Sequence, residues 1–166
     1  MKNIKDDKRE QYKLEKRLQK MQKSPHVAVG ILQDEPVDDE FTMVDLATVH
    51  ELGSKDGRIP ARSFFRSPLD SKRAEYPKLI AKLQDAYVIG KLTMKQALTQ
   101  FGEMVVGDMK ETINNGIKPD LAESTKKAKK QSIKKQKKKL SGIGFRPLIE
   151  TGVLKGSITH QVRGAS

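Results

Sequence analysis

Three histidines are the side chains in this sequence best suited to catalysis or metal binding. His26, His50 and His160 lie far apart along the chain, and none has a second ligand at the spacing that a helix or hairpin would provide. His50 is followed by a glutamate, but no second histidine completes an HExxH pattern. We therefore interpret the histidines as structural residues.

Five carboxylates between residues 34 and 40 form the second candidate site, a possible divalent-cation site. The segment QDEPVDDE lacks the alternating oxygen ligands and the central glycine of a calcium-binding EF-hand loop, so we interpret it as a solvated loop. The patterns GxxxxGK[ST], GxGxxG and GxSxG, which mark phosphate-binding loops and nucleophile elbows, do not occur. These observations predict a protein that is not an enzyme and that uses no cofactor or metal.

A lysine-rich run, KKAKKQSIKKQKKK at 126–139, carries nine positive charges and no acid. Such a run would neutralise phosphates without base specificity, because lysine is a point charge with no stacking face. The alternative is a flexible, solvated insertion whose like charges repel each other. The candidate residues for contact with a polyanion are Lys126, Lys127, Lys129, Lys130, Lys134, Lys135, Lys137, Lys138 and Lys139.

Composition restricts the class of protein. The 166 residues carry a formal charge of +12, with 36% hydrophobic and 33% charged residues and no cysteine, so neither disulfides nor thiolate metal sites can form. Most of the excess positive charge lies in the lysine-rich run and in residues 1–23. The apolar runs are far shorter than the roughly 20 residues of a membrane span. We expect a soluble protein, made in the cytoplasm, that has no membrane partner.

Periodicity predicts the elements that would position any site. Sparse apolar residues in 1–23 indicate a charged, solvated helix that ends before Pro25, and HVAVGIL at 26–32 is typical of a strand. Residues 41–53 fit a strand or a short helix closed by Gly53, and we favour the helix.

The second half of the chain supplies longer helices. Apolar residues three and four apart predict one helix around 79–89 and a second over 94–115, which Thr93 would cap. SITHQV at 157–162 alternates like a strand. Together the elements predict an α+β fold in which a small antiparallel sheet packs against the two longer helices. We divide the chain into an N-terminal arm, 1–25, and one domain, 26–166, with a basic insertion at about 126–145.

Four sequence elements occur in an order that resembles the head-tail joining proteins of tailed bacteriophages, also called virion-morphogenesis, neck or tail-completion proteins. The elements are VHELG at 49–53, IPARSFFR at 59–66, PDLAEST at 119–125 and PLIETGVLKGSI at 147–158. The resemblance spans roughly residues 26–162, and residues 1–25 lie outside it. Ser63 stands where the family pattern usually has proline.

The resemblance implies a structural virion protein in the neck or tail, made in the host bacterial cytoplasm. Its implied partners are like subunits in a ring, connector or adaptor proteins, and tail terminator or tail tube proteins, with the DNA backbone in the channel as a further partner. The alternatives are a basic, non-sequence-specific DNA-binding accessory protein and another minor tail or capsid protein.

The resemblance also nominates site residues. The subunit-interface candidates are Ile59, Pro60, Arg62, Phe64, Phe65 and Arg66. In an extended segment the two adjacent phenylalanines would point to opposite sides, one into the core and one toward a partner, with both arginines on the rim; the alternative is that both rings are core. The family-motif turn comprises Thr151, Gly152, Leu154 and Ser157, and we expect Gly152 to adopt a positive φ in a turn into the final strand.

Overall fold

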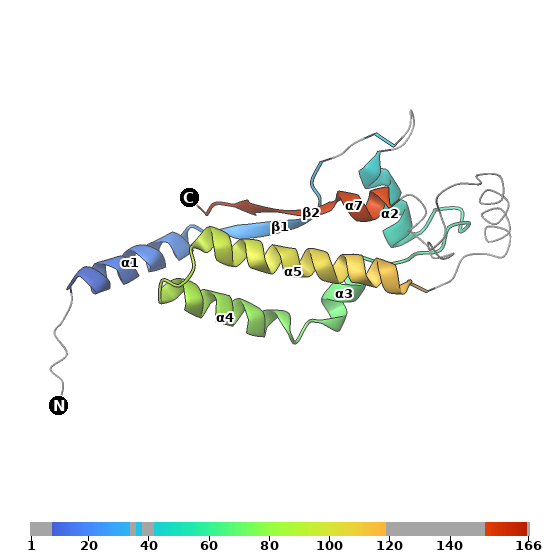
Figure 1. The fold of residues 1–166 in the computed structure, drawn as a ribbon. Coiled ribbons are helices and arrows are strands. Elements are labelled where there is room, and N and C mark those ends of the chain that lie inside the picture. The colour runs from blue at the N-terminus through green and yellow to red at the C-terminus, as the bar shows by residue number, and fades with distance from the viewer. Residues whose placement is uncertain (1–7, 34–35, 38–41, 119–151, 166) are drawn as a thin grey trace, which may run out of the picture.

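A two-stranded antiparallel sheet lies on a long central helix in the computed structural model, which describes residues 8–33, 36–37, 42–118 and 152–165 (Figure 1). Strands β1 (His26–Ile31) and β2 (Ile158–Arg163) pair with Ile31 opposite Ile158. The sheet packs against α5 (Met94–Asn115), and α4 (Tyr76–Val88) packs against another side of α5. This arrangement confirms the predicted α+β fold. The lysine-rich extension lies outside the described residues.

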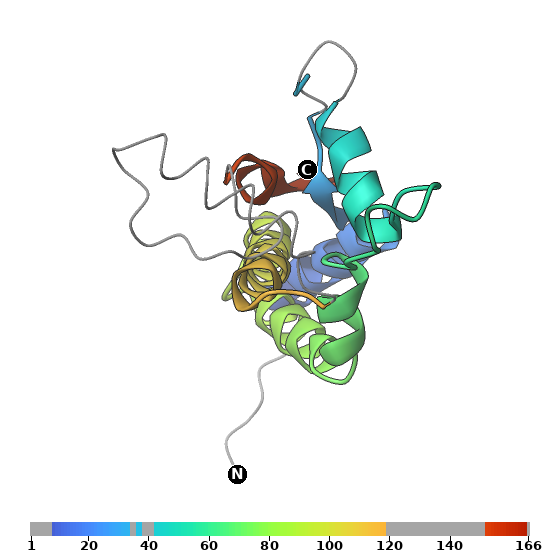
Figure 2. The same ribbon diagram turned by 90° about the vertical axis from the view of Figure 1, so that its right-hand side faces the viewer.

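In the described part of the chain, four further helices lie around this framework. α1 (Lys8–Gln22) precedes β1, contacts α4 and contains no buried residue, as predicted for a solvated arm. α2 (Met43–Leu52), α3 (Arg66–Ser71) and α7 (Val153–Ser157) gather around the other end of the sheet and of α5. In Figure 2, seen nearly along α5, α2 and α7 lie on either side of the end of the sheet.

Capping residues define where α2 and α5 begin. Thr42 caps α2 and exchanges hydrogen bonds with Asp45, and Thr93 does the same with Gln96 at the start of α5. Each reciprocal pair satisfies backbone N–H groups that have no partner within the helix. α2 is followed by Gly53 at φ 85°. The helix favoured over 41–53, its closing glycine and the Thr93 cap are therefore confirmed.

The hydrophobic core lies where α2, the 62–65 turn, the second half of α5 and the junction of α7 with β2 meet. Phe64, Ile113 and Ile158 are its fully buried members. Because these three come from segments far apart in the sequence, burial of their apolar surface ties the whole chain together. The other buried members are Met43, Ala47, Tyr76, Val105, Met109 and Leu154.

The family-motif turn is only partly what we expected. Gly152 has φ 67°, in the left-handed region that glycine tolerates best, as predicted. However, the chain enters the short helix α7 before the strand, and this helix buries Leu154 in the core. Ser157 ends α7 and its hydroxyl donates to the Leu154 carbonyl. Thr151 lies outside the described residues.

Two glycines of α5 provide a matched pair for testing how closely the sheet lies on this helix. A Cβ atom on Gly102 would lie 2.8 Å from the His160 ring and from Val27, whereas one on Gly107 would meet no atom within 4 Å. Gly102→Ala is expected to lower the free energy of unfolding by about 1–2 kcal/mol through overpacking. Gly107→Ala should raise it by about 0.5–1 kcal/mol, because alanine restricts the unfolded chain and favours helix. Urea denaturation of both variants measures the difference, and equal effects would contradict the close packing.

Candidate assembly surface

The elements HELG at 50–53 and IPARSFFR at 59–66, which are separated by residues 54–58, are joined by one carboxylate. Glu51, in the last turn of α2, accepts hydrogen bonds from the Ser63 hydroxyl at 2.5 Å, the Phe65 amide at 2.9 Å and the Arg66 amide at 3.2 Å. We call this set of contacts the clasp. Because a carboxylate accepts such bonds more strongly than a neutral oxygen does, the clasp fixes the turn that begins α3 against the end of α2.

Backbone hydrogen bonds next to the clasp also join the two elements. The Arg62 amide donates to the His50 carbonyl at 2.7 Å, and the Ser54 amide donates to the Ile59 carbonyl at 2.8 Å. At Gly53 a Cβ atom would lie 3.0 Å from the Ile59 carbonyl oxygen and from the Ala61 nitrogen. The end of α2 and the IPARSFFR segment can therefore approach this closely only if the residue is glycine.

The loop between the two elements is held in a compact shape by Ser54 and Asp56. The Ser54 hydroxyl donates to the Asp56 carboxylate at 2.6 Å, and that carboxylate also accepts from the Arg58 amide at 3.1 Å. The hydrogen bond from Ser54 and the bond from the Arg58 amide lower the pKa of Asp56 below its ordinary value. These hydrogen bonds fix the loop in one conformation, in which Ile59 and Pro60 are exposed to solvent.

The predicted interface residues divide between core and surface. Ile59, Pro60 and Arg66 are exposed, as an interface would require. Arg62 is only 4% exposed, so its expected place on the rim is wrong. Its backbone amide donates to the His50 carbonyl, and its guanidinium donates to the Pro60 carbonyl at 3.5 Å.

The expected opposite orientation of the two phenylalanines is also wrong. Phe64 is fully buried and Phe65 is partly buried against the same core, with their ring centroids 4.4 Å apart. Alternation requires extended backbone, but Phe65 has helical dihedral angles at the start of α3. The two rings therefore serve the core together, which was the alternative, and the exposed candidates reduce to Ile59, Pro60 and Arg66. All nine lysines proposed for polyanion contact lie outside the described residues.

Asp108 forms a polar cluster that the sequence did not reveal. This carboxylate is 8% exposed in the middle of α5 and accepts from Lys72 Nζ at 2.7 Å and from the Tyr76 hydroxyl at 2.9 Å. The sequence does hold a signal for this cluster, because Asp108 lies within the apolar stripe of α5, between Val105 and Met109. A carboxylate buried there needs hydrogen-bond donors or a positive charge as partners. The cluster attaches the α3–α4 junction to α5.

The Asp108 cluster predicts a loss of stability at alkaline pH. Burial, and then the hydrogen bond to Asp108, raise the pKa of Tyr76 well above its ordinary value of 10.0. The hydrogen bond to Asp108 likewise raises the pKa of Lys72 above 10.5. Because both folded-state pKa values are raised, their contribution is complete below about pH 10 and is lost as the pH rises through them.

Tyr76→Phe is therefore expected to lower the free energy of unfolding by about 1–2 kcal/mol at neutral pH, since Asp108 loses one donor. It should also reduce the further loss of stability above about pH 10. Thermal unfolding measured from neutral to alkaline pH tests both effects, with Tyr12→Phe on exposed α1 as the control. An unchanged alkaline slope in Tyr76→Phe would contradict the assignment.

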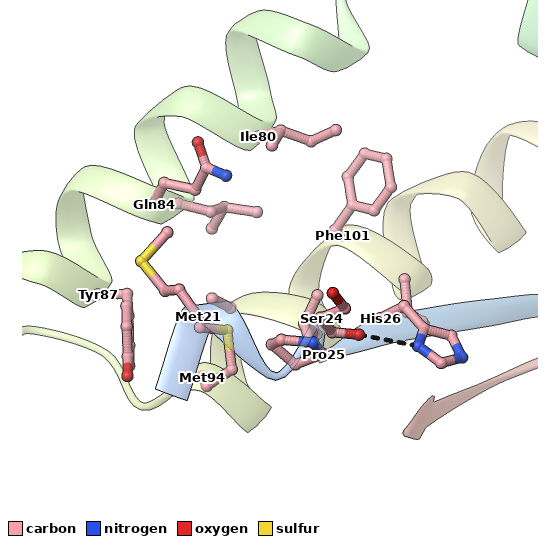
Figure 3. A pocket seen from close by; sticks show the side chains of 13 residues that line it. Met21, Ser24, Pro25, His26, Ile80, Gln84, Tyr87, Met94 and Phe101 are labelled. Atoms are coloured by element: carbon pink, nitrogen blue, oxygen red, sulfur yellow. Dashed lines mark hydrogen bonds between the residues drawn. The ribbon is translucent and has the colours of Figure 1, made fainter. Parts of the chain in front are cut away.

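An apolar cavity of about 360 Å³ lies beneath the end of α1 (Figure 3). Met21 of α1, Ile80 and Tyr87 of α4, and Met94 and Phe101 of α5 line it. Above it, two hydrogen bonds fasten the arm: Arg17 donates to the Val88 carbonyl at 3.1 Å, and the Tyr87 hydroxyl donates to the Arg17 carbonyl at 2.9 Å. A guanidinium at the end of α4 is also favoured by the helix dipole.

The three histidines lie on different elements of the part of the chain that the structure describes. His26, His50 and His160 occupy β1, α2 and β2, and no three His, Asp or Glu residues of the described ranges are close enough to hold an ion. Within the same ranges no helix has the length and apolarity needed to cross a membrane.

The arrangement that stands out is therefore a surface: the 54–60 loop, held by the clasp, beside an apolar groove between β1 and α2. Comparisons of the chain with protein-family models, with curated proteins and with solved structures find no match.

Proposed function

We propose that this protein is a structural virion protein that joins or completes the head-tail interface of a tailed bacteriophage. In this role it acts as one subunit of an oligomeric ring in the neck or tail and catalyses no reaction. Its partners are copies of itself and the connector, adaptor, tail terminator or tail tube proteins of the particle. The proposal begins from the resemblance of four sequence elements to the head-tail joining family.

The clasp is the observation that carries the proposal. Glu51 belongs to the HELG element, and its three donors belong to the IPARSFFR element. Two segments that resemble the family are therefore held together as one structural unit. Such a unit supports a surface that must keep its shape against neighbours, because a preorganised loop loses less conformational entropy on binding.

The exposed tip of this unit fits a protein contact. Ile59 is 37% exposed beside Pro60, and Arg66 is exposed on the following helix. An apolar centre with arginine at its edge is the composition that protein interfaces favour.

Electron microscopy of particles tests the proposal directly. In the phage whose genome encodes this chain, an amber codon in its reading frame is expected to yield separate heads and tails, and the wild-type gene in trans should restore joined particles. An antibody against the chain should label the neck or tail of intact virions. Joined, infectious particles in the amber mutant would overturn the proposal.

A matched pair of surface variants tests the 54–60 loop. Ile59→Asp should reduce joined particles at least about tenfold, because a charge replaces an apolar contact at a subunit interface. Ile89→Asp changes a similarly apolar and more exposed residue, 62% exposed at the end of α4, and should leave joining unchanged. Equal yields from both variants would exclude the loop as the joining surface.

A third variant separates assembly from DNA binding. Replacing the nine lysines of 126–139 by serine removes the charge that would bind a DNA backbone. Particles that assemble normally while the purified protein loses DNA affinity would favour a basic DNA-binding accessory protein over a joining protein.

A further inference from the structure

The groove beside β1 is an exposed apolar surface at the end of the molecule opposite α1. It has a volume of about 400 Å³ and lies between β1, α2 and α3, with Val29 and Ile31 on one wall. Across from them, Val44, Leu52 and Leu69 remain 39%, 63% and 40% exposed. Three large apolar side chains gathered on one surface from two helices indicate a contact site.

Acidic side chains outnumber lysine and arginine on the two helices that form the walls of the groove. α2 carries Asp45 and Glu51 and no lysine or arginine, and α3 carries Asp70 and Arg66. Glu51 lines the groove itself, and Asp45 is exposed on α2. A partner for this surface should therefore combine apolar side chains with positive charge.

α1 has this combination. It carries six lysines and arginines against two glutamates, a net charge of +4, over fifteen residues. Leu14 and Leu18, one helical turn apart, are 38% and 45% exposed, and no residue of α1 is buried. Arg17 holds the helix on α4 without covering these leucines. At about 1.5 Å per residue the helix is roughly 22 Å long, enough to span a groove between two elements.

Geometry places the occupant on another copy. α1 and the groove lie at opposite ends of the molecule in Figure 1, and α1 is fastened to its own α4. We infer that the groove between β1 and α2 receives the basic α1 helix of a neighbouring copy. A contact between two different surfaces of identical subunits is head to tail, and it closes into a ring when the rotation between copies permits. This inference rests on the self-association in the proposed function and assigns the surfaces that carry it.

Two full-length variants test the contact, each removing one half of it. Leu14→Asp with Leu18→Asp disables the arm, and Leu52→Asp with Leu69→Asp disables the groove. All four side chains are more than one third exposed, so the fold should tolerate the changes, and far-UV circular dichroism checks this. Sedimentation velocity of the wild type should show oligomers that dissociate as salt rises from about 50 to about 500 mM, because the charges become screened.

Each variant alone should weaken self-association at least about tenfold, since each buried leucine contributes a factor of that order. Mixed in equal amounts, the two variants should form a one-to-one dimer and nothing larger, because one supplies an intact arm and the other an intact groove. Met104→Asp, 48% exposed on α5, is the control and should assemble like the wild type.

Three outcomes overturn the inference: a wild type that stays monomeric at every concentration, variants that assemble like the wild type, or a mixture that forms no dimer. If the groove variant alone assembles normally but loses a different virion protein from particles, that protein and not α1 is the occupant. Labelling of virions by antibody does not depend on these variants. Failure of the docking contact can thus be distinguished from failure of the proposed function.

Discussion

Phe64→Ala is expected to lower the free energy of unfolding by about 3–5 kcal/mol, the usual loss when a fully buried phenylalanine leaves a cavity. Phe64 has no exposed surface and lies in the core with Met109 and Ile113. For a protein of this size, such a loss removes a large fraction of the whole stability. Urea denaturation followed by far-UV circular dichroism measures it.

Phe65→Ala provides the comparison for Phe64→Ala. Phe65 is partly exposed, so its loss should cost less than half as much, about 1–2 kcal/mol. If the two substitutions had the reverse order of effect, Phe65 would be the core anchor and Phe64 would be free for a partner. The pair thus decides between the buried arrangement described here and the one expected from an extended segment.

Glu51→Ala is the second substitution with a large expected effect. It removes the common acceptor of the clasp and leaves three donors without their partner. We expect a loss of about 2–4 kcal/mol, because hydrogen bonds to a charged acceptor are stronger than average and the Phe65 and Arg66 amides at the start of α3 lose their acceptor. Hydrogen exchange of the Phe65 and Arg66 amides should accelerate more than that of α5.

Two controls make the Glu51 result specific. Ser63→Ala removes one of the three bonds and should cost only about 0.5–1.5 kcal/mol. Glu103→Ala removes an exposed carboxylate of α5 and should change stability by no more than about 0.5 kcal/mol. If Glu51→Ala behaved like Glu103→Ala, the clasp would contribute nothing to joining the two elements.

Local signals in the sequence were sufficient for most of the secondary structure. Thr93 and Gly116 bound α5, Gly53 follows α2, and Pro25 follows α1, because caps and prolines act within a few residues. A small antiparallel sheet was predicted and is confirmed, but the residues that pair in it were not predicted. The register depends on how both strands pack against α5 and the core, and no local sequence pattern indicates these long-range contacts.

The site was harder to predict because it depends on contacts between distant residues. The 59–66 segment was predicted to be a contact element, but its burial of Arg62 and Phe64 and its hydrogen bond from Ser63 to Glu51, twelve residues earlier, were not predicted. Asp108 meets Lys72 and Tyr76 across more than thirty positions. Neither cluster could be predicted from the spacing of its residues, because side chains that meet through tertiary packing have no fixed separation in the sequence.

The separation of the two strands has a consequence for synthesis in the cell. Ile31 pairs with Ile158, which the ribosome adds 127 residues later. At ordinary elongation rates the delay between the two residues is about 6–25 s. Throughout that interval HVAVGI is an apolar segment with both of its edges unpaired. Such segments promote the aggregation of nascent chains. Lys20 and Lys23 precede it and Asp34 and Glu35 follow it, so charged gatekeepers stand on both sides. These charges would protect the unfinished chain until its last strand is made.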